Sequence, residues 1–194
     1  MLRVIDNFFS DPYRVRNMGL EGEYYSSDDN RWPGYRWHPP EQFRKFYLDK
    51  VSNILNEKIS LDYLHFQYID KSWVGGMCHP DSPPHKYTCL TYLTPDPPSN
   101  SGTEVYEAGC PKNANVNGIT KETFYRSDRG IMKRWFYKRD MEKYNSAWNN
   151  PCIVANKFNR TLLFDSIRYH RAQNFFGNTI GDSRFTLIGF LSAA

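Results

Sequence analysis

Three residues of the sequence have the types and spacing to bind one metal ion. His79-Pro80-Asp81 places an imidazole and a carboxylate two residues apart. In an extended chain, residues i and i+2 point to the same face, so both side chains can reach one ion. His170, in a segment typical of a strand, could supply a third ligand. Two histidines and one carboxylate leave three positions open on an octahedral iron, enough for a bidentate cosubstrate and dioxygen.

Each histidine also has an ordinary structural explanation. The chain contains five histidines, and a His-x-Asp tripeptide is common by chance. His79 would then be a loop histidine beside a proline-rich turn, and His170 a strand histidine satisfied by hydrogen bonds. The metal hypothesis therefore depends on the motifs that surround these residues.

Two N-terminal helices are expected ahead of these residues. Residues 3–9 are typical of a short strand or extended segment, and Ser10 can cap a helix that ends near Leu20. Pro40 opens a second helix, because apolar residues follow at spacings of three and four. They are Phe43, Phe46, Tyr47, Val51, Ile54 and Leu55.

Residues 21–40 lack periodicity and are expected to form a loop. Within them, residues 31–38 are aromatic and basic. They are either a packed loop or one wall of a binding cleft, since loops carry function disproportionately.

The sequence after residue 60 is typical of strands rich in β-branched and aromatic residues, separated by Pro and Gly turns. The expected strands are 61–69, 87–94, 161–166, 168–176 and 184–192. Helices followed by strands favour an α+β, mainly β fold, in which an antiparallel sandwich or barrel carries N-terminal helices.

Residues 107–155 look like an insertion or lid. Within them, residues 111–150 hold nine Lys or Arg against four Asp or Glu, a local charge of +5, so the whole positive excess of the chain, whose net charge is +4, lies here. We favour a solvated lid or long loop over a contact surface for an acidic partner such as nucleic acid. A single domain over 1–194 is expected, with helices at about 10–58 and a β core at about 60–106 and 156–193.

Composition excludes several classes of protein. The 194 residues are 40% hydrophobic and 16% aromatic, which argues against disorder. No run of 18 apolar residues occurs, and the apolar start is too short for a signal peptide, so we expect a cytoplasmic protein with no membrane contact. The four cysteines include no Cys-x-x-Cys pair, which argues against a zinc ribbon.

The order of motifs resembles that of the Fe(II)/2-oxoglutarate-dependent dioxygenases, in their prolyl-hydroxylase-like branch. In that family, His-x-Asp is followed by a Tyr-Leu strand, a Gly-Gly-Thr-like turn, an LxFDS segment with a histidine, and Arg or Lys two residues before Ser or Thr. The matching motifs are His79-Pro80-Asp81, Tyr92-Leu93, Ser101-Gly102-Thr103, Leu163-Phe164-Asp165-Ser166 with His170, and Arg184-x-Thr186. The resemblance covers residues 60–106 and 156–193.

The resemblance implies a double-stranded β-helix, or jelly roll, with the N-terminal helices packed on its major sheet. It implies an oxygenase that hydroxylates a substrate, most readily a protein or peptide side chain, and releases succinate and carbon dioxide. Fe(II), 2-oxoglutarate and dioxygen would take part, with ascorbate as a stimulant.

The resemblance also implies roles for individual residues. His79, Asp81 and His170 would be the iron ligands at the catalytic centre. Arg184 would bind the distal carboxylate of 2-oxoglutarate, for which a planar guanidinium is well suited. Thr186, on the same strand face, would add a hydroxyl to that carboxylate.

The resemblance leaves more than one candidate for binding the cosubstrate. Tyr92 matches the family's tyrosine donor to the same carboxylate, and Tyr68 is a further candidate for lining the cosubstrate pocket. The interval before Arg184 is longer than usual in the family, so Arg168 or Arg171 could be the carboxylate partner instead. Arg171 should point away from the metal, and Arg168 would crowd it.

Other functions remain open at this stage. DNA-repair demethylases of the same superfamily carry a second arginine six residues after the first, where this chain has Phe190. A non-catalytic jelly-roll binding module, or a phage structural or interaction protein, is the alternative outside enzymes. A phage-encoded chain would act in the host cytoplasm. The substrate and the oligomeric state are not indicated by the sequence.

Overall fold

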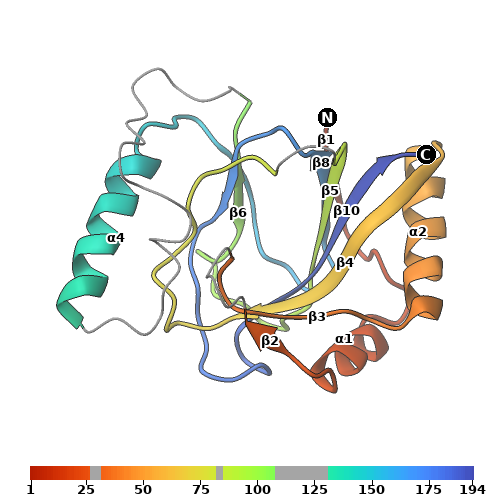
Figure 1. Cartoon of the computed structure of the whole chain (residues 1–194), viewed down its shortest axis with the longest axis horizontal. Helices are drawn as coiled ribbons and strands as arrows, with labels where there is room; N and C mark the ends of the chain where they lie inside the picture. The colour runs from red at the N-terminus through yellow and green to blue at the C-terminus, as the bar shows by residue number, and fades with distance from the viewer. Residues whose placement is uncertain (27–31, 82–84, 108–130) are drawn as a thin grey trace.

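The computed structural model describes residues 1–26, 32–81, 85–107 and 131–194. Helices and strands follow one another along the chain as shown in Figure 1. They are β1 (Leu2–Ile5), α1 (Pro12–Leu20), β2 (Tyr25–Ser26), β3 (Tyr35–Trp37), α2 (Glu41–Leu55), β4 (Ile59–Ile69), β5 (Tyr87–Tyr92), β6 (Thr103–Val105), α4 (Ile131–Asn145), β7 (Cys152–Val154), β8 (Thr161–Asp165), β9 (His170–Ala172) and β10 (Arg184–Ala193).

Two antiparallel sheets form the body of the protein. The major sheet has the strand order β1-β8-β5-β10-β4-β3-β2, and the minor sheet has the order β7-β6-β9. The long strand β10 lies between β4 and β5, where Thr186 is opposite both Gln67 and Tyr92. The expected mainly β fold is confirmed.

Strand alternation gives β10 two different faces. Phe185, Leu187 and Leu191 are buried in the largest hydrophobic cluster. Arg184 and Thr186 point to the opposite face, where they line a cavity between the sheets. The period of two that places apolar residues in the core therefore also places the polar residues in the cavity.

The two N-terminal helices cover the outer face of the major sheet, as predicted. Tyr47 of α2 is fully buried, and a Cβ atom built on Gly189 of β10 would lie 2.8 Å from its ring. A Cβ on Gly19 of α1 would lie 2.6 Å from the rings of Phe66 and Phe185. Glycine at both positions lets helix and sheet approach closely.

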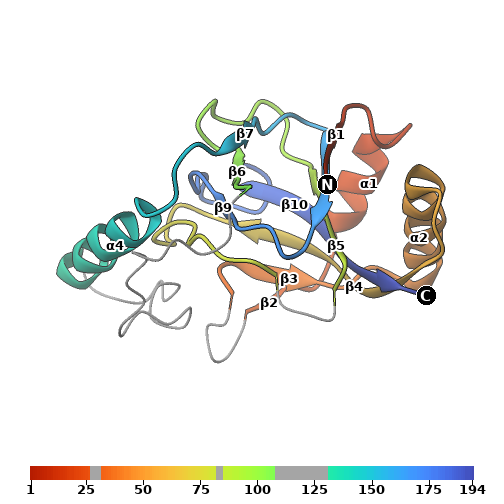
Figure 2. The same ribbon diagram turned by 90° about the horizontal axis from the view of Figure 1, so that it is seen from above.

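Helix α4 lies at the far end of the molecule from α1 and α2, and Figures 1 and 2 agree on this placement. Met141 and Tyr144 of α4, together with Trp148, are buried in a second hydrophobic cluster. That cluster also contains Trp73 and Met77, from the segment that leads to His79. The end of the expected insertion is part of the sheet structure, since β7 pairs with β6.

Several expectations for local structure were wrong in detail. Asp11, not Ser10, caps α1, because its side chain accepts a hydrogen bond from the Arg14 backbone N–H. The segment 21–40 is not all loop: β3 pairs with β4, an interaction that local periodicity cannot indicate. The strand expected at 168–176 is limited to His170–Ala172. Among the described residues, no helix has the length and apolar character to cross a membrane.

Candidate metal centre and cosubstrate cavity

The structure brings His79, Asp81 and His170 together. One potential ligand atom from each lies within 4.8 Å of the others. His79 Nε2 is 3.9 Å from Asp81 Oδ1, and His170 Nε2 is 3.6 Å from Asp81 Oδ2. The two imidazole rings lie side by side, with centroids 4.7 Å apart.

Backbone carbonyls orient both imidazoles. His79 Nδ1 is 2.7 Å from the Met77 carbonyl oxygen, and His170 Nδ1 is 3.0 Å from that of Arg168. A carbonyl only accepts, so Nδ1 carries the proton and Nε2 of each neutral ring presents a lone pair. This is the arrangement in which histidine binds metals.

The hydroxyl group of Thr88 holds the carboxylate of Asp81. Thr88 Oγ1 donates to Asp81 Oδ2 over 2.6 Å, and it also lies 3.0 Å from Ser166 Oγ. The bond engages one oxygen of Asp81 and fixes the plane of the carboxylate. The sequence analysis gave Ser166 only as part of the LxFDS motif and gave no role to Thr88, which belongs to the same strand as Tyr92.

Backbone pairing positions the ligands despite their separation in sequence. His79 N–H donates to the His170 carbonyl over 3.1 Å, and His170 N–H donates to the His79 carbonyl over 2.9 Å. Asp81 N–H donates to the carbonyl of Ser166 over 2.9 Å. The segment that carries the His-x-Asp motif is thereby fixed against the LxFDS region.

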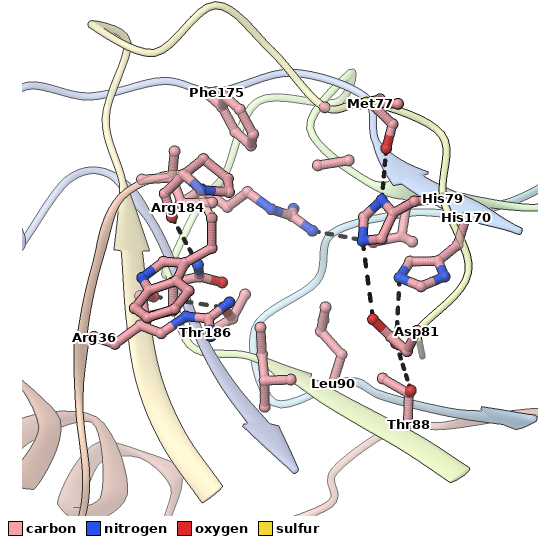
Figure 3. Close-up of a pocket in the computed structure, with 18 of the residues that line it drawn as sticks. Arg36, Met77, His79, Asp81, Thr88, Leu90, His170, Phe175, Arg184 and Thr186 are labelled. Atoms are coloured by element: carbon pink, nitrogen blue, oxygen red, sulfur yellow. Dashed lines mark hydrogen bonds and ion pairs between the residues drawn. The ribbon is translucent and has the colours of Figure 1, made fainter. Parts of the chain in front are cut away.

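The three residues line a cavity of about 240 Å³ between the sheets. Figure 3 shows them grouped on one side, across from Thr186 and Arg36. Many of the remaining wall residues are apolar. They include Ile69, Met77, Leu90, Phe175, Ile188 and Phe190.

Arg184 is the buried cation of this cavity, with only 3% of its surface exposed. Its Nη1 donates to the Ser101 carbonyl over 2.5 Å, and its Nη2 donates to Thr103 Oγ1 over 3.0 Å. The guanidinium carbon also lies 5.1 Å from the centre of the Tyr92 ring. Because a guanidinium has five N–H donors, these contacts leave donors for an anion.

The polar turn before β10 explains how the long interval still delivers Arg184 to the cavity. Asp182 accepts hydrogen bonds from the backbone N–H groups of Asn178 and Thr179, at 2.9 and 2.7 Å. Gly177 begins the turn with a φ of +79°, a conformation that favours glycine. The extra residues are accommodated in this turn outside the cavity.

The two tyrosines do not line the cavity. Tyr92 lies behind Arg184, and its hydroxyl donates to Thr103 Oγ1 over 2.6 Å. Tyr68 points to the opposite face of β4, where it packs against Tyr24 and Tyr35 with ring centroids 5.1 and 4.8 Å apart. The placement of Tyr68 in the cosubstrate pocket needs correction, because alternation gives that face to its neighbour Gln67.

The alternative arginines are engaged elsewhere. Arg171 binds Glu104 through two hydrogen bonds of 2.5 and 3.1 Å. Arg168 Nε lies 3.8 Å from Asp165 Oδ2. Neither side chain lines the cavity.

Three cavity residues escaped the sequence analysis as individuals. Trp32 and Arg36 come from the aromatic and basic segment, with the Arg36 guanidinium carbon 4.2 Å from the centre of the Trp32 ring. Gln67 donates to the Pro33 carbonyl over 2.8 Å. Part of this segment therefore forms a cavity wall, which was one of its two interpretations; Arg31 lies outside the described residues.

The residues fit a bound divalent metal. Ligand atoms bonded to one ion at about 2.1 Å lie about 3–4 Å from one another. The two distances to Asp81 fall in this range. Two neutral imidazoles and one carboxylate on one side of a cavity suit non-haem iron(II) with open positions.

The fold is similar to that of solved oxygenases. A 2OG-Fe(II) oxygenase family protein from Burkholderia pseudomallei matches 98% of this chain and 84% of its own, with a TM-score of 0.60 and 9% identity. HygX from Streptomyces hygroscopicus, solved with nickel, 2-oxoglutarate and hygromycin B, matches 100% of this chain and 83% of its own, with a TM-score of 0.63 and 12% identity. A Pseudomonas putida prolyl-4-hydroxylase matches 100% of this chain and 92% of its own, with a TM-score of 0.58 and 12% identity.

These similarities establish the class of fold: the protein has the jelly roll of the 2-oxoglutarate-Fe(II) oxygenases, as predicted. The chain belongs to DUF6445, a family of unknown function whose profile matches residues 1–174. The matched region contains all three candidate metal ligands, whereas Arg184 follows it. No curated protein sequence matches the chain.

Proposed function

We propose that this protein is an Fe(II)- and 2-oxoglutarate-dependent oxygenase that hydroxylates a C–H bond of its substrate. The observation that carries the proposal is one cavity with two parts: three converging metal-ligand side chains and a buried arginine. Bound iron and 2-oxoglutarate would supply the oxidising chemistry, in which dioxygen is consumed and succinate and carbon dioxide are released.

His79, Asp81 and His170 would hold the metal. The carbonyls of Met77 and Arg168 accept from Nδ1 of the two rings, which orients each Nε2 lone pair toward the ion. All three ligands come from one side, so the opposite side stays open for cosubstrate and oxygen.

Arg184 and Thr186 would bind the distal carboxylate of 2-oxoglutarate. Ser101 and Thr103 hold the guanidinium in place before the anion arrives, so little side-chain entropy is lost on binding. The apolar residues Leu90 and Ile188 exclude water and strengthen the charge pairing. Tyr92 would act by supporting Arg184 and Thr103 from behind.

The substrate would be a protein or peptide side chain. The fold shared with the Pseudomonas putida prolyl-4-hydroxylase supports this class. Nucleic-acid demethylation is less well supported, since Phe190 occupies the position of the second arginine. A non-catalytic binding module would not need a complete ligand set. We further propose that residues 1–194 form a single domain and that the protein acts in the cytoplasm. Ascorbate would stimulate its activity.

Anaerobic titration with Fe(II) and 2-oxoglutarate tests the proposal without a substrate. A chelated iron–keto acid complex gives a visible charge-transfer band, which we expect in the wild type and in Asp6→Ala. Asp6 is a matched control because its carboxylate pairs with Arg160 at the surface. The band should be absent in Asp81→Ala. A folded wild-type protein that binds Fe(II) but gives no band would rule out the proposed function.

A further inference from the structure

A second cavity adjoins the metal cavity and shares three of its walls. It has a volume of about 340 Å³. Trp32, Arg36 and Phe190 line both cavities, so these side chains lie between the two spaces. The full lining consists of Tyr25, Trp32, Arg36, His38, Tyr63, His65, His85 and Phe190.

The walls are almost entirely flat rings. Phe190 stacks on His85, with centroids 5.0 Å apart and planes 27° apart, and lies 5.9 Å from the ring of His65. On the other wall, the Arg36 guanidinium lies over the Trp32 ring. Rings pack best against other rings in offset or edge-on arrangements, which stabilise the contact beyond simple burial.

Hydrogen bonds hold the walls in place. The Tyr25 hydroxyl is 2.6 Å from His38 Nε2, and His38 Nδ1 is 2.9 Å from the Leu64 carbonyl oxygen. His65 is 1% exposed, and burial, followed by the charges of Arg36 and His38, lowers its pKa well below the usual value. His65 is therefore neutral at neutral pH.

The charge of the lining selects against cations. None of the lining residues in the described part of the chain is a carboxylate, and Arg36 is positively charged. Aromatic cages for quaternary ammonium groups combine rings with a favourable field for a cation, which this cavity lacks. An uncharged aromatic ring, in contrast, is attracted to both the ring walls and the guanidinium.

One wall residue offers a fixed polar edge. His85 Nδ1 lies 2.7 Å from Asp62 Oδ2, which also accepts a hydrogen bond from the Ser192 hydroxyl. The carboxylate fixes the orientation of the imidazole and leaves its Nε2 edge for a hydrogen bond to a ligand. An apolar cavity of about 150 Å³ is enough to hold benzene, so this cavity has room for a ring with a polar substituent.

We propose that the second cavity binds a planar aromatic ring of the substrate, with a hydroxyl or ring N–H at its edge, while the attached aliphatic carbon reaches the metal cavity. That the bound ring belongs to the substrate rests on the proposed function. That the cavity binds an aromatic ring does not. Phe190 and Trp32 would form the passage between ring and reacting carbon.

The test uses p-cresol as the probe and 4-methylcyclohexanol as its saturated counterpart, with the metal-free protein observed by NMR titration. We expect p-cresol to bind about 3- to 10-fold more tightly than 4-methylcyclohexanol, because aromatic rings pair favourably with one another. Phe190→Leu should abolish most of this preference. Phe46→Leu is the matched control, because Phe46 is a half-exposed phenylalanine on α2.

Equal affinity for the two probes, no binding of either, or a preference that survives Phe190→Leu would overturn the inference. The iron and 2-oxoglutarate titration is carried out separately on the same proteins. Preferential binding of p-cresol without the charge-transfer band would refute the proposed function and leave the ring site standing. The charge-transfer band without a preference for p-cresol would leave the proposed function standing and overturn the ring site.

Discussion

Thr88 Oγ1 donates a hydrogen bond of 2.6 Å to Asp81 Oδ2 inside the candidate metal centre. Thr88 is 2% exposed, so the bond is shielded from water. A hydrogen bond to a charged acceptor is stronger than a neutral one and fixes its direction. The position of the carboxylate is therefore set by a neighbouring strand as well as by its own backbone.

Removing this hydroxyl should weaken metal binding. For Thr88→Val, which keeps the shape of the side chain, we expect a 10- to 100-fold loss of Fe(II) affinity, the range typical for residues that orient a ligand. Isothermal titration of the anaerobic protein would measure it. Thr88→Ser retains the donor and should bind like the wild type. Unchanged affinity in the valine variant would show that Asp81 needs no such support.

Arg184 should determine the affinity for 2-oxoglutarate. Arg184→Gln removes the charge opposite the distal carboxylate, and hydrogen bonds to charged groups contribute about 1.5–3 kcal/mol, so affinity should fall about 10- to 100-fold. The charge-transfer titration measures this directly. Arg168→Gln is the matched control and should have no effect, because Arg168 lies outside the cavity. A loss of affinity in Arg168→Gln, with none in Arg184→Gln, would mean that Arg168 binds the distal carboxylate of 2-oxoglutarate.

The Glu104–Arg171 pair should make stability depend on pH. Burial raises the pKa of Glu104, but the hydrogen bonds from Arg171 and Tyr106 outweigh this effect, and the pKa is below its usual value of 4.5. A lowered carboxyl pKa stabilises the fold above the unfolded-state pKa, and this stabilisation is lost as the pH falls through the folded-state pKa.

We therefore expect Glu104→Gln to lower the Tm at neutral pH, with a loss of about 1–3 kcal/mol. The difference from the wild type should shrink as the pH falls below about 4.5. Thermal melts of both proteins from pH 7 to pH 3 would measure it. A constant difference across this range would mean that the charge of Glu104 contributes nothing.

The contact between α2 and β10 should not tolerate an added methyl group. Gly189→Ala would place a Cβ 2.8 Å from the Tyr47 ring, which must shift, so we expect a loss of about 1–3 kcal/mol. Urea denaturation would measure it. Gly181→Ala is the control, because its Cβ would meet only Thr179 Oγ1 at 3.8 Å. Equal stability of both variants would show that the helix adjusts freely.

The sequence predicted the metal and arginine motifs because each is local. His79 and Asp81, like Arg184 and Thr186, are two residues apart, and alternation places each pair on one side of the chain. The structure places all four in one cavity. Their convergence was indicated only by the order of the motifs, since no local pattern specifies which strands pair.

Tyr68 was misplaced because its assignment did not take the alternation of β4 into account. Leu64, Phe66 and Tyr68 pack toward the helices, whereas Gln67 lines the cavity. The alternation of these three residues with the polar His65 and Gln67 indicates this orientation.

Trp32 and Arg36 were missed as individuals for another reason. Arg36 lies within the three-residue strand β3 and Trp32 precedes it, and the conformation of β3 depends on pairing with β4. Propensity within residues 21–40 carries no information about that partner.

The position of β10 between β4 and β5 also has a consequence for biosynthesis. Both of its neighbours leave the ribosome long before Arg184–Ala193, so each has an unpaired edge while the rest of the chain is made. Such edges favour pairing between nascent chains. Both edges therefore stay open to such pairing until β10 emerges and lies between them.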